Sequence, residues 1–256
     1  KGKLLKMLEM EEAIRMSPAY IRACTNLENE VNGWLRISGE LQQKVVGQYG
    51  YKDPIMNILA VNHLRRAQYL YPEDSRFKDT QVYVRNNHAK TGTLSLGDIP
   101  PNVKLHDLDN KEVHLHDLLG EDKPTLFIGS SESWQPFRSI VDILQTDIYE
   151  KYYHLVNIII IYIDEAHGYD VWPIGGSAGV YNLSHKCIGD RLECAVNFKE
   201  RYNYTIPIYL DNMNNDFKNI YSVWPFRAFL INKKKIEYIA KPNDSEYDVL
   251  EIYQLL

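Results

Sequence analysis

A carboxylate, two imidazoles and an indole follow one apolar run in the second half of this chain. Glu165, His167 and Trp172 come soon after the run 156–163, and His185 stands further along. A carboxylate near imidazoles that titrate close to neutral pH can orient a phenolic hydroxyl or act as a general acid or base, and an indole offers a stacking face for an aromatic ring. The plainer alternative is that Glu165 caps a loop, His167 lies at the surface and Trp172 fills the edge of a core.

Candidate nucleophiles are few. The chain has three cysteines, Cys24, Cys187 and Cys194, and no two have CxxC spacing, which argues against a disulfide framework and against a zinc site. Cys187 and Cys194 are seven residues apart near one helical face, and either one is a candidate redox thiol. The simpler expectation for Cys194 is a buried core thiol, because apolar residues flank it. Ser133 lacks the Gly-x-Ser-x-Gly elbow of hydrolytic serines, which disfavours a hydrolase.

The elements that must position these side chains form an α/β pattern. Alternating apolar residues around the Asp109-Asn110 turn predict a β-hairpin. The run 156–163 is nearly all apolar and β-branched, which predicts a central strand covered on both faces. The other elements are expected in this order: strand 125–128, helix 136–153, strand 156–163, helix 188–202, strand 206–210, helix 217–223, strands 227–231 and 235–240, and a closing helix from Asp244. That is the order of a thioredoxin-like fold with an N-terminal β-hairpin, and Trp224-Pro225 stands where such folds keep a cis-proline facing the reactive site.

The first part of the chain predicts a small all-α region. Ser17-Pro18 and Asp53-Pro54 each pair an N-cap residue with proline at the first helical position. Apolar residues recur at spacings near three and four over 21–41, as one face of an amphipathic helix requires. A third helix stops at Pro72, and a polar stretch follows. We therefore expect a helical region over 1–72, a linker over 73–100 and the sheet domain over 101–256.

Two stretches of the sheet domain resemble hallmark segments of the iodothyronine deiodinases. They are Gly129-Ser-Ser-Glu-Ser-Trp-Gln-Pro-Phe137 and Tyr162-Ile-Asp-Glu-Ala-His167, the second followed by Asp170 and Trp172. Further matches run in the family's order: His185, Asp190-Arg191-Leu192, Asp211-Asn212-Met213-Asn214, and Tyr221 ahead of Pro225. The resemblance covers residues 101–256 and implies a protein of the kind that removes iodine reductively from an aromatic ring.

The family carries a selenocysteine or cysteine in the first stretch, and this chain does not. Aligned from Gly129, the reactive position falls on Ser133, the family's usual threonine on Glu132, and its two prolines become Trp134-Gln135-Pro136 with one residue inserted. A serine hydroxyl is far less acidic than a thiol and neither accepts a halogen nor forms a mixed disulfide. We therefore expect the family's redox step to be lost, unless Ser133 stands in place of a reactive residue.

The resemblance implies roles for particular side chains. Ser133, Glu165 and His185 are expected at catalytic positions. The residues expected to bind substrate are Glu132, Trp134, His167, Trp172, Arg191 and Pro225. No metal and no cofactor are expected.

Composition limits the partners and the location. The 34 acidic and 29 basic residues are interspersed and give a net charge of -5, which is no footprint for nucleic acid. No run reaches the ~18 to 20 apolar residues that span a bilayer. The sparse cysteines favour a reducing compartment, so we expect an intracellular, cytoplasmic location, with an anchor or transit peptide upstream of Lys1 left open.

Three functions are consistent with these patterns. The first is a deiodinase-like thioredoxin-fold protein with a diverged site that binds an aromatic or phenolic small molecule. The second is a non-catalytic structural or assembly subunit that contacts a protein partner or a second copy of itself. The third is an active thiol oxidoreductase or reductive dehalogenase that uses Cys187 or Cys194. Because the usual nucleophile is missing, the pattern leaves open whether the chain is an enzyme.

Overall fold

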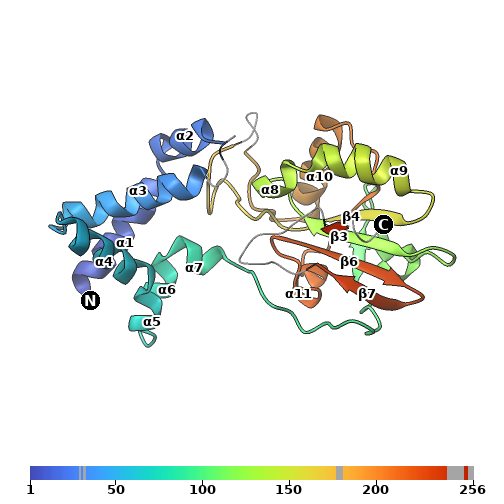
Figure 1. The fold of residues 1–256 in the computed structure, drawn as a ribbon, viewed down its shortest axis with the longest axis horizontal. Helices are drawn as coiled ribbons and strands as arrows, with labels where there is room; N and C mark the ends of the chain where they lie inside the picture. Colours follow the sequence, from blue (N-terminus) through green and yellow to red (C-terminus); the bar gives the residue numbers. More distant parts are fainter. Residues whose placement is uncertain (29, 31–32, 177–180, 241–250, 253–256) are drawn as a thin grey trace. The chain divides into compact units, whose positions relative to one another are not determined.

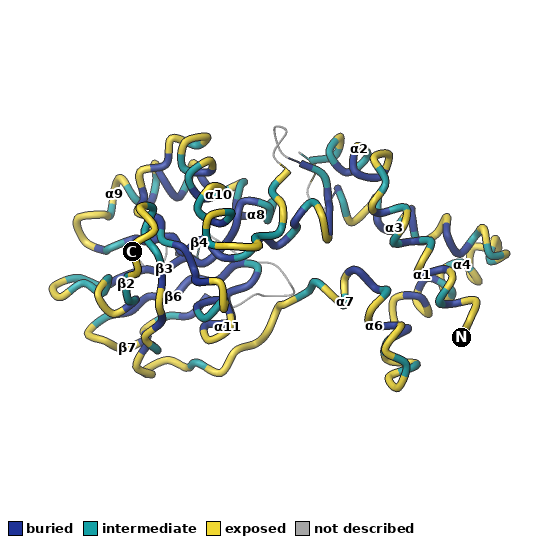
Figure 2. The backbone as a smooth tube through the Cα atoms, turned by 180° about the vertical axis from the view of Figure 1, so that it is seen from behind, coloured by how far each residue is buried: buried dark blue, intermediate teal, exposed yellow. Residues whose placement is uncertain are grey.

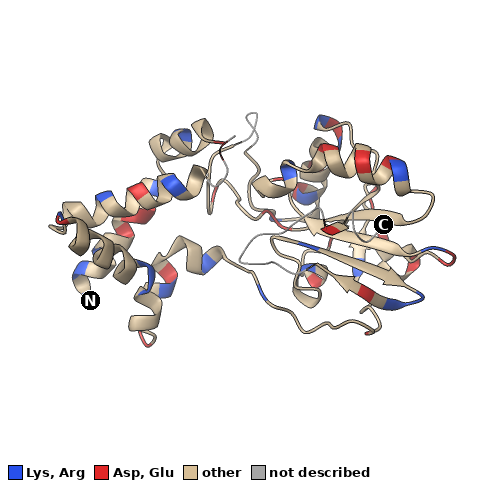
Figure 3. Ribbon diagram, viewed as in Figure 1, with Lys and Arg blue, Asp and Glu red and all other residues tan. Residues whose placement is uncertain are grey.

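The computed structural model describes residues 1–28, 30, 33–176, 181–240 and 251–252. The chain forms two compact units (Figure 1). The helical unit consists of Lys1–Asn87 and His167–Leu183, and the sheet unit consists of His88–Ala166 and Ser184–Leu256. Charged side chains of both signs are interspersed on the elements of each unit (Figure 3). Within the described ranges, no helix is both long and apolar enough to cross a membrane.

Two helices of the helical unit begin at the N-cap residues that the sequence predicts. Ser17 accepts a hydrogen bond from the backbone N–H of Tyr20, and Asp53 accepts from the N–H groups of Ile55 and Met56, so each side chain satisfies donors in the first turn of its helix. The helices are α1 (Gly2–Arg15), α2 (Pro18–Asn26), α3 (Gly33–Gln48), α4 (Pro54–Arg65), α5 (Ala67–Leu70), α6 (Arg76–Thr80) and α7 (Val82–Asn86). The short helices α6 and α7 lie within the stretch expected to be a linker.

The single amphipathic helix expected over 21–41 is two helices, α2 and α3, with a break between them. A side chain at Gly33 would meet the carbonyl oxygen of Leu27 at 2.4 Å, so the chain folds back on itself here. The two apolar faces still share one core, which includes Ile21, Cys24 and Leu41, whereas Leu35 is 47% exposed. The spacing therefore predicted much of the buried face but not the break.

Residues of the second half of the chain join this helical core. Tyr169 packs against it, and the N–H of Gly176 donates to Oγ1 of Thr25 at 3.2 Å. A side chain on Gly175 would lie 2.7 Å from the backbone nitrogen of Thr25, so only glycine allows this approach. The segment His167–Leu183, expected inside the sheet domain, therefore belongs to the helical unit.

The sheet unit is built on seven strands among the described residues, in the order β2-β1-β5-β4-β3-β6-β7. The strands are β1 (Lys104–His106), β2 (Glu112–His114), β3 (Thr125–Ser130), β4 (Asn157–Tyr162), β5 (Ile208–Asp211), β6 (Phe226–Asn232) and β7 (Lys235–Ile239). Strands β3, β4 and β5 are parallel, whereas β6 is antiparallel to β3 and β7 is antiparallel to β6. The β-α-β unit followed by an antiparallel hairpin, in the order β4-β3-β6-β7, is a thioredoxin-like fold. The hairpin β1–β2 precedes it, as predicted.

Helices cover both faces of the sheet (Figure 1). On one face lie α8 (Gln135–Arg138), a π-helix (Ile143–Tyr149), α9 (Glu150–Tyr152) and α10 (Ile188–Arg201), and on the other lies α11 (Asp216–Ile220). The helix expected over 136–153 is thus interrupted and partly π-helical. The closing helix expected from Asp244 falls largely outside the described residues.

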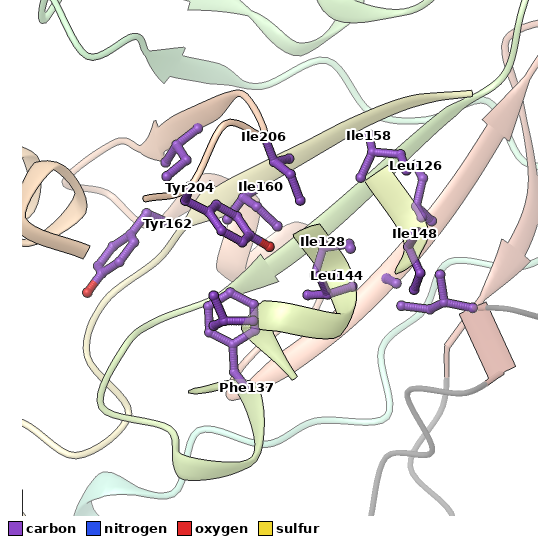
Figure 4. Packing of buried hydrophobic residues seen from close by; sticks show 14 of the residues in the cluster. Leu126, Ile128, Phe137, Leu144, Ile148, Ile158, Ile160, Tyr162, Tyr204 and Ile206 are labelled. Atoms are coloured by element: carbon purple, nitrogen blue, oxygen red, sulfur yellow. The ribbon is translucent and has the colours of Figure 1, made fainter. Parts of the chain in front are cut away.

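The core of the sheet unit explains the apolar run in β4. Every residue from Ile158 to Tyr162 is buried, so β4 is a central strand covered on both faces, as predicted. The central strands β3, β4 and β6 are dark in the burial view, while exposed residues lie on loops, on outer helix faces and on the outer strands β2 and β7 (Figure 2). Side chains of β3, β4 and the covering helices meet in one cluster, with the ring of Tyr162 inside it and the hydroxyl at its edge (Figure 4).

An extended strap, residues 88–101, holds to the sheet unit by backbone contacts. Arg227 is 3% exposed and donates to the carbonyl oxygens of Thr91 and Lys90, each at 3.0 Å. The hydroxyl of Tyr221 donates to the carbonyl of Pro101 at 2.6 Å. The second part of the expected linker is therefore part of the sheet unit.

Candidate functional site

Glu165 is the centre of a buried polar cluster at the carboxyl end of β4. Its Oε2 accepts the backbone N–H of Ser133 at 3.0 Å, and its Oε1 accepts the hydroxyl of Tyr162 at 2.5 Å. The Nε2 of His185 lies 3.6 Å from the same Oε1, and the side chains of His185 and Glu165 are 1% and 0% exposed. Burial acts to raise the pKa of Glu165, but interactions with His185, Ser133 and Tyr162 outweigh it and lower that pKa. Glu165 is therefore ionised at neutral pH.

The register of β3 against β4 brings Ser133 to Glu165. Ser130 and Tyr162, the last residues of these parallel strands, are paired, so the turns that follow them lie together. The hydroxyl of Ser131 accepts the N–H of Ala166 at 3.1 Å, which ties the two turns. Ser133 contacts Glu165 through its backbone N–H, so this contact does not depend on which side chain residue 133 carries.

The hydrogen bond at Nδ1 of His185 determines the tautomer of its neutral ring. The Nε of Arg191 donates to Nδ1 of His185 at 3.2 Å. A guanidinium has no acceptor and stays protonated, so Nδ1 must accept and a neutral ring carries its proton on Nε2. That N–H lies on the same side of the ring as the carboxylate of Glu165.

Arg191, expected to bind substrate, is 1% exposed, and its guanidinium contacts protein groups. Its Nη1 donates to the carbonyls of Asp211 and Asn212 at 2.7 and 2.9 Å, and its Nη2 donates to Oδ1 of Asn215 at 2.8 Å. Burial lowers the pKa of the guanidinium. The side chain fixes the loop after β5 and orients His185.

The remaining expected site residues of the sheet unit are largely packed. Glu132 is 1% exposed and forms an ion pair with Arg201. The ring of Trp134 stacks on Phe226, with centroids 5.4 Å apart. The peptide bond before Pro225 is cis, and the hydroxyl of Ser130 donates to the Pro225 carbonyl at 3.1 Å. The cis-proline thus adjoins the end of β3.

His167 and Trp172 belong to the helical unit rather than to the unit that holds Glu165. Their rings lie 4.5 Å apart, and both face Trp34, at 5.6 and 6.2 Å. Trp172 is 4% exposed. The sequence placed these residues close to Glu165 along the chain, but the loop that follows β4 leaves the sheet and carries them into an aromatic cluster with Trp34.

Tyr162 was not among the expected site residues of the cluster, whereas Cys194, which also joins it, was considered as a candidate redox thiol. Tyr162 has its pKa raised well above the ordinary value by burial and then by the charge of Glu165, so its hydroxyl remains a donor. It stands in the family-like stretch three residues before Glu165, and that spacing was the available signal. Cys194 joins through α10, and a ligand-type atom from each of Glu165, His185 and Cys194 lies within 4.8 Å of the others.

The cysteines are poor candidates for a redox step. Burial, followed by the charges of Glu165 and Glu132, raises the pKa of Cys194 to about 12, which keeps the thiol protonated at neutral pH. Cys187 is exposed, and its thiol donates to the carboxylate of Asp190 at 3.3 Å as the N-cap of α10. An adjacent carboxylate does not activate a thiol.

The set of Glu165, His185 and Cys194 has the donor types of a transition-metal site. Metal binding at Nε2 would need the lone pair there, and the hydrogen bond from Arg191 assigns the proton to that atom. Arg191 therefore disfavours a metal at this position, because ligating histidines place their proton on the other nitrogen.

The parallel strands β3 and β4 with the antiparallel hairpin β6–β7 place the protein in the thioredoxin-like class, and its polar centre lies at the carboxyl ends of β3 and β4. The model of the family described as iodothyronine deiodinase matches residues 61–256. The chain belongs to the iodothyronine deiodinase family.

The chain is also similar to individual deiodinases over part of its length. The chain is 27% identical over 161 residues to a type I iodothyronine deiodinase of Xenopus laevis, covering 63% of this chain and 62% of the relative. It is 23% identical over 153 residues to a type II iodothyronine deiodinase of Bos taurus, covering 58% and 56%. The match thus spans about three fifths of these relatives. Among solved structures, a thioredoxin-like protein from Porphyromonas gingivalis is 17% identical with a TM-score of 0.44, covering 63% of this chain and 90% of its own.

Proposed function

We propose that this deiodinase-family chain binds a phenolic small molecule at the cluster of Ser133, Glu165 and His185 and lacks the family's selenol or thiol step. The observation that carries the proposal is the hydrogen bond from the Ser133 amide to the Glu165 carboxylate. It joins the reactive position of the family motif to an ionised acid, while the side chain at that position is a hydroxyl.

Glu165 already accepts one phenol. The hydroxyl of Tyr162 donates to it at 2.5 Å, so the carboxylate suits a second aromatic hydroxyl of similar acidity. The Nε2–H of His185 on the same side suits an oxygen acceptor. A phenolic ligand would find an acceptor and a donor there, which is the pairing that a hydroxyl group needs.

The redox half of the family's chemistry has no suitable carrier among these groups. Removing iodine reductively requires a selenol or thiol to take up the halogen and then a second thiol to reduce the intermediate. Ser133 offers neither, and the raised pKa of Cys194 leaves almost no thiolate. These facts favour binding without turnover over the thiol oxidoreductase.

Burial is the observation that favours a structural subunit as the second candidate. The side chains of Glu165 and His185 are 0% and 1% exposed, as in a site that serves stability alone. A ligand would reach Glu165 only after a neighbouring side chain moves. Binding is therefore the property that separates the two candidates.

The first experiment measures iodide release from iodothyronines and iodotyrosines with dithiothreitol, for the unaltered chain and for Ser133→Cys. We expect release only after the substitution, since the backbone contact of residue 133 with Glu165 is kept. Titration calorimetry with the same compounds should show binding by the unaltered chain and at least tenfold weaker binding by Glu165→Gln, with the exposed Glu200→Gln as the matched control.

Iodide release by the unaltered chain would show that it still carries out the redox step and would overturn that part of the proposal. If circular dichroism shows that Ser133→Cys is folded, the absence of both iodide release and ligand binding would reject the ligand site. That result would favour the structural subunit.

A further inference from the structure

The helical unit holds a pocket that the proposed function does not use. It lies between α1 and α4 and has a volume of about 320 Å³, at the lower end of the range for small-molecule sites. Apolar side chains make most of its lining, including Leu4, Met7, Met56 and Leu59. Leu4 and Met7 are buried, and they give the pocket a floor continuous with the helical core.

Two ammonium groups line this pocket, together with the imidazole of His63 and the hydroxyl groups of Tyr51 and Tyr71. Lys3 holds its ammonium 4.5 Å from the ring centroid of Tyr51, and Lys1 lies 5.0 Å from that of Tyr71. None of the residues that the structure describes along the pocket is acidic. Asp74, which does not line the pocket, interacts electrostatically with Lys1, so Lys3 is the cation that the pocket offers to an anionic ligand beside the apolar floor.

The adjoining face of α4 exposes apolar surface. Met56 and Leu59, which line the pocket, are 49% and 56% exposed, and their neighbours Ile55 and Ile58 are 71% and 57% exposed. Isolated exposed apolar residues are ordinary, but four on one helix face form a contiguous apolar surface of the kind that binding sites present. The pocket opens within this surface.

We propose that this pocket binds an amphipathic monocarboxylate, with its aliphatic chain along Leu4, Met7 and Leu59 and its carboxylate at Lys3. An ammonium on a flexible stem acts as a point charge and suits a single carboxylate, whereas a guanidinium fork would favour bidentate pairing. Methionines adapt their shape to a flexible chain. The anionic head and the apolar tail thus each have a matching surface.

This site is separate from the phenol site of the sheet unit. The family match begins at residue 61, so α1 and the start of α4 fall outside it. Loss of binding here would leave the proposed function untouched, and failure of the proposed function would leave this site untouched.

The test is titration calorimetry of the full chain with decanoate and with decanol, which share the tail and differ in the charge. We expect saturable binding of decanoate and at least tenfold weaker binding of decanol. Lys3→Met should weaken decanoate binding about fivefold, as expected for one partly solvated ion pair. Lys6→Met is the matched control, because Lys6 is exposed on the same helix and does not line the pocket.

A second pair of variants tests the apolar part. Leu59→Glu places a carboxylate at the pocket and should abolish decanoate binding, whereas Ile58→Glu, on the same helix and equally exposed, should leave it within twofold. Equal binding of decanoate and decanol, equal effects of Lys3→Met and Lys6→Met, or no saturable binding would each overturn the proposal.

Discussion

Arg191 donates from Nε to Nδ1 of His185 at 3.2 Å, and this contact decides which nitrogen of the ring carries the proton. The Nε2–H that results lies on the side of Glu165, 3.6 Å from Oε1. A residue expected to touch substrate thus acts on the candidate site through another side chain. The same guanidinium fixes the loop after β5, so the orientation of His185 depends on that loop.

Arg191→Lys should lower the free energy of unfolding. It should also allow the neutral ring of His185 to carry its proton on either nitrogen. A lysine cannot serve the two carbonyls, the amide oxygen and the ring nitrogen together, and the buried groups left without a donor should cost about 2 to 4 kcal/mol. Urea denaturation measures the loss, and nitrogen-15 shifts of the imidazole report the tautomer. The exposed Arg22→Lys should change neither. An unchanged imidazole spectrum in Arg191→Lys would contradict the assignment.

Alkylation should distinguish the cysteines. With its pKa raised to about 12, Cys194 should carry about a thousandfold less thiolate than an ordinary exposed cysteine. Brief treatment of the folded chain with iodoacetamide near pH 8 should therefore label the exposed Cys187 and leave Cys194 unmodified, as read by peptide mass spectrometry. Both should be labelled in urea. Comparable labelling in the folded chain would show that Cys194 is more reactive than its surroundings allow.

Asp211 should make a contribution to stability that decreases as pH rises. Burial raises its pKa to about 6 from an ordinary 3.8, so the folded chain holds the proton more tightly than the unfolded chain. The stabilisation is complete below the ordinary pKa and is lost as pH rises through about 6.

Asp211→Asn removes this titration. Its destabilisation relative to the unaltered chain should be greater at pH 4 than at pH 7 by up to about 3 kcal/mol, measured by urea denaturation at both pH values. Asp109→Asn, in the exposed hairpin turn, serves as the control and should show no such change. A destabilisation by Asp211→Asn that is equal at the two pH values would contradict the raised pKa.

Arg227→Met should free the start of the strap at residues 88–101. The guanidinium holds the carbonyls of Lys90 and Thr91, so its removal should expose the Lys90 peptide bond to trypsin and speed cleavage there about tenfold. Cleavage in the exposed turn at Lys234, which Arg227 does not contact, should keep its rate. If both sites were cleaved faster, the substitution would have loosened the whole unit instead.

Local sequence signals determined much of the fold. Ser17 and Asp53 are caps because a side-chain oxygen next to a proline-led first turn can satisfy only nearby donors. The apolar run of β4 predicted a central strand because alternate side chains of a strand point to opposite faces, and here both sets are apolar. The family motifs likewise identified Ser133, Glu165 and His185, which the structure brings into one cluster.

Tertiary structure decided the rest of the candidate site. Tyr162 lies three residues before Glu165, but Cys194 reaches it from a helix that is distant in sequence, and no local pattern specifies that meeting. His167 and Trp172 are close to Glu165 in sequence, yet they pack with Trp34 in the helical unit. Sequence patterns encode what each segment can bury, whereas the partner that buries it is chosen by packing between segments far apart in the chain.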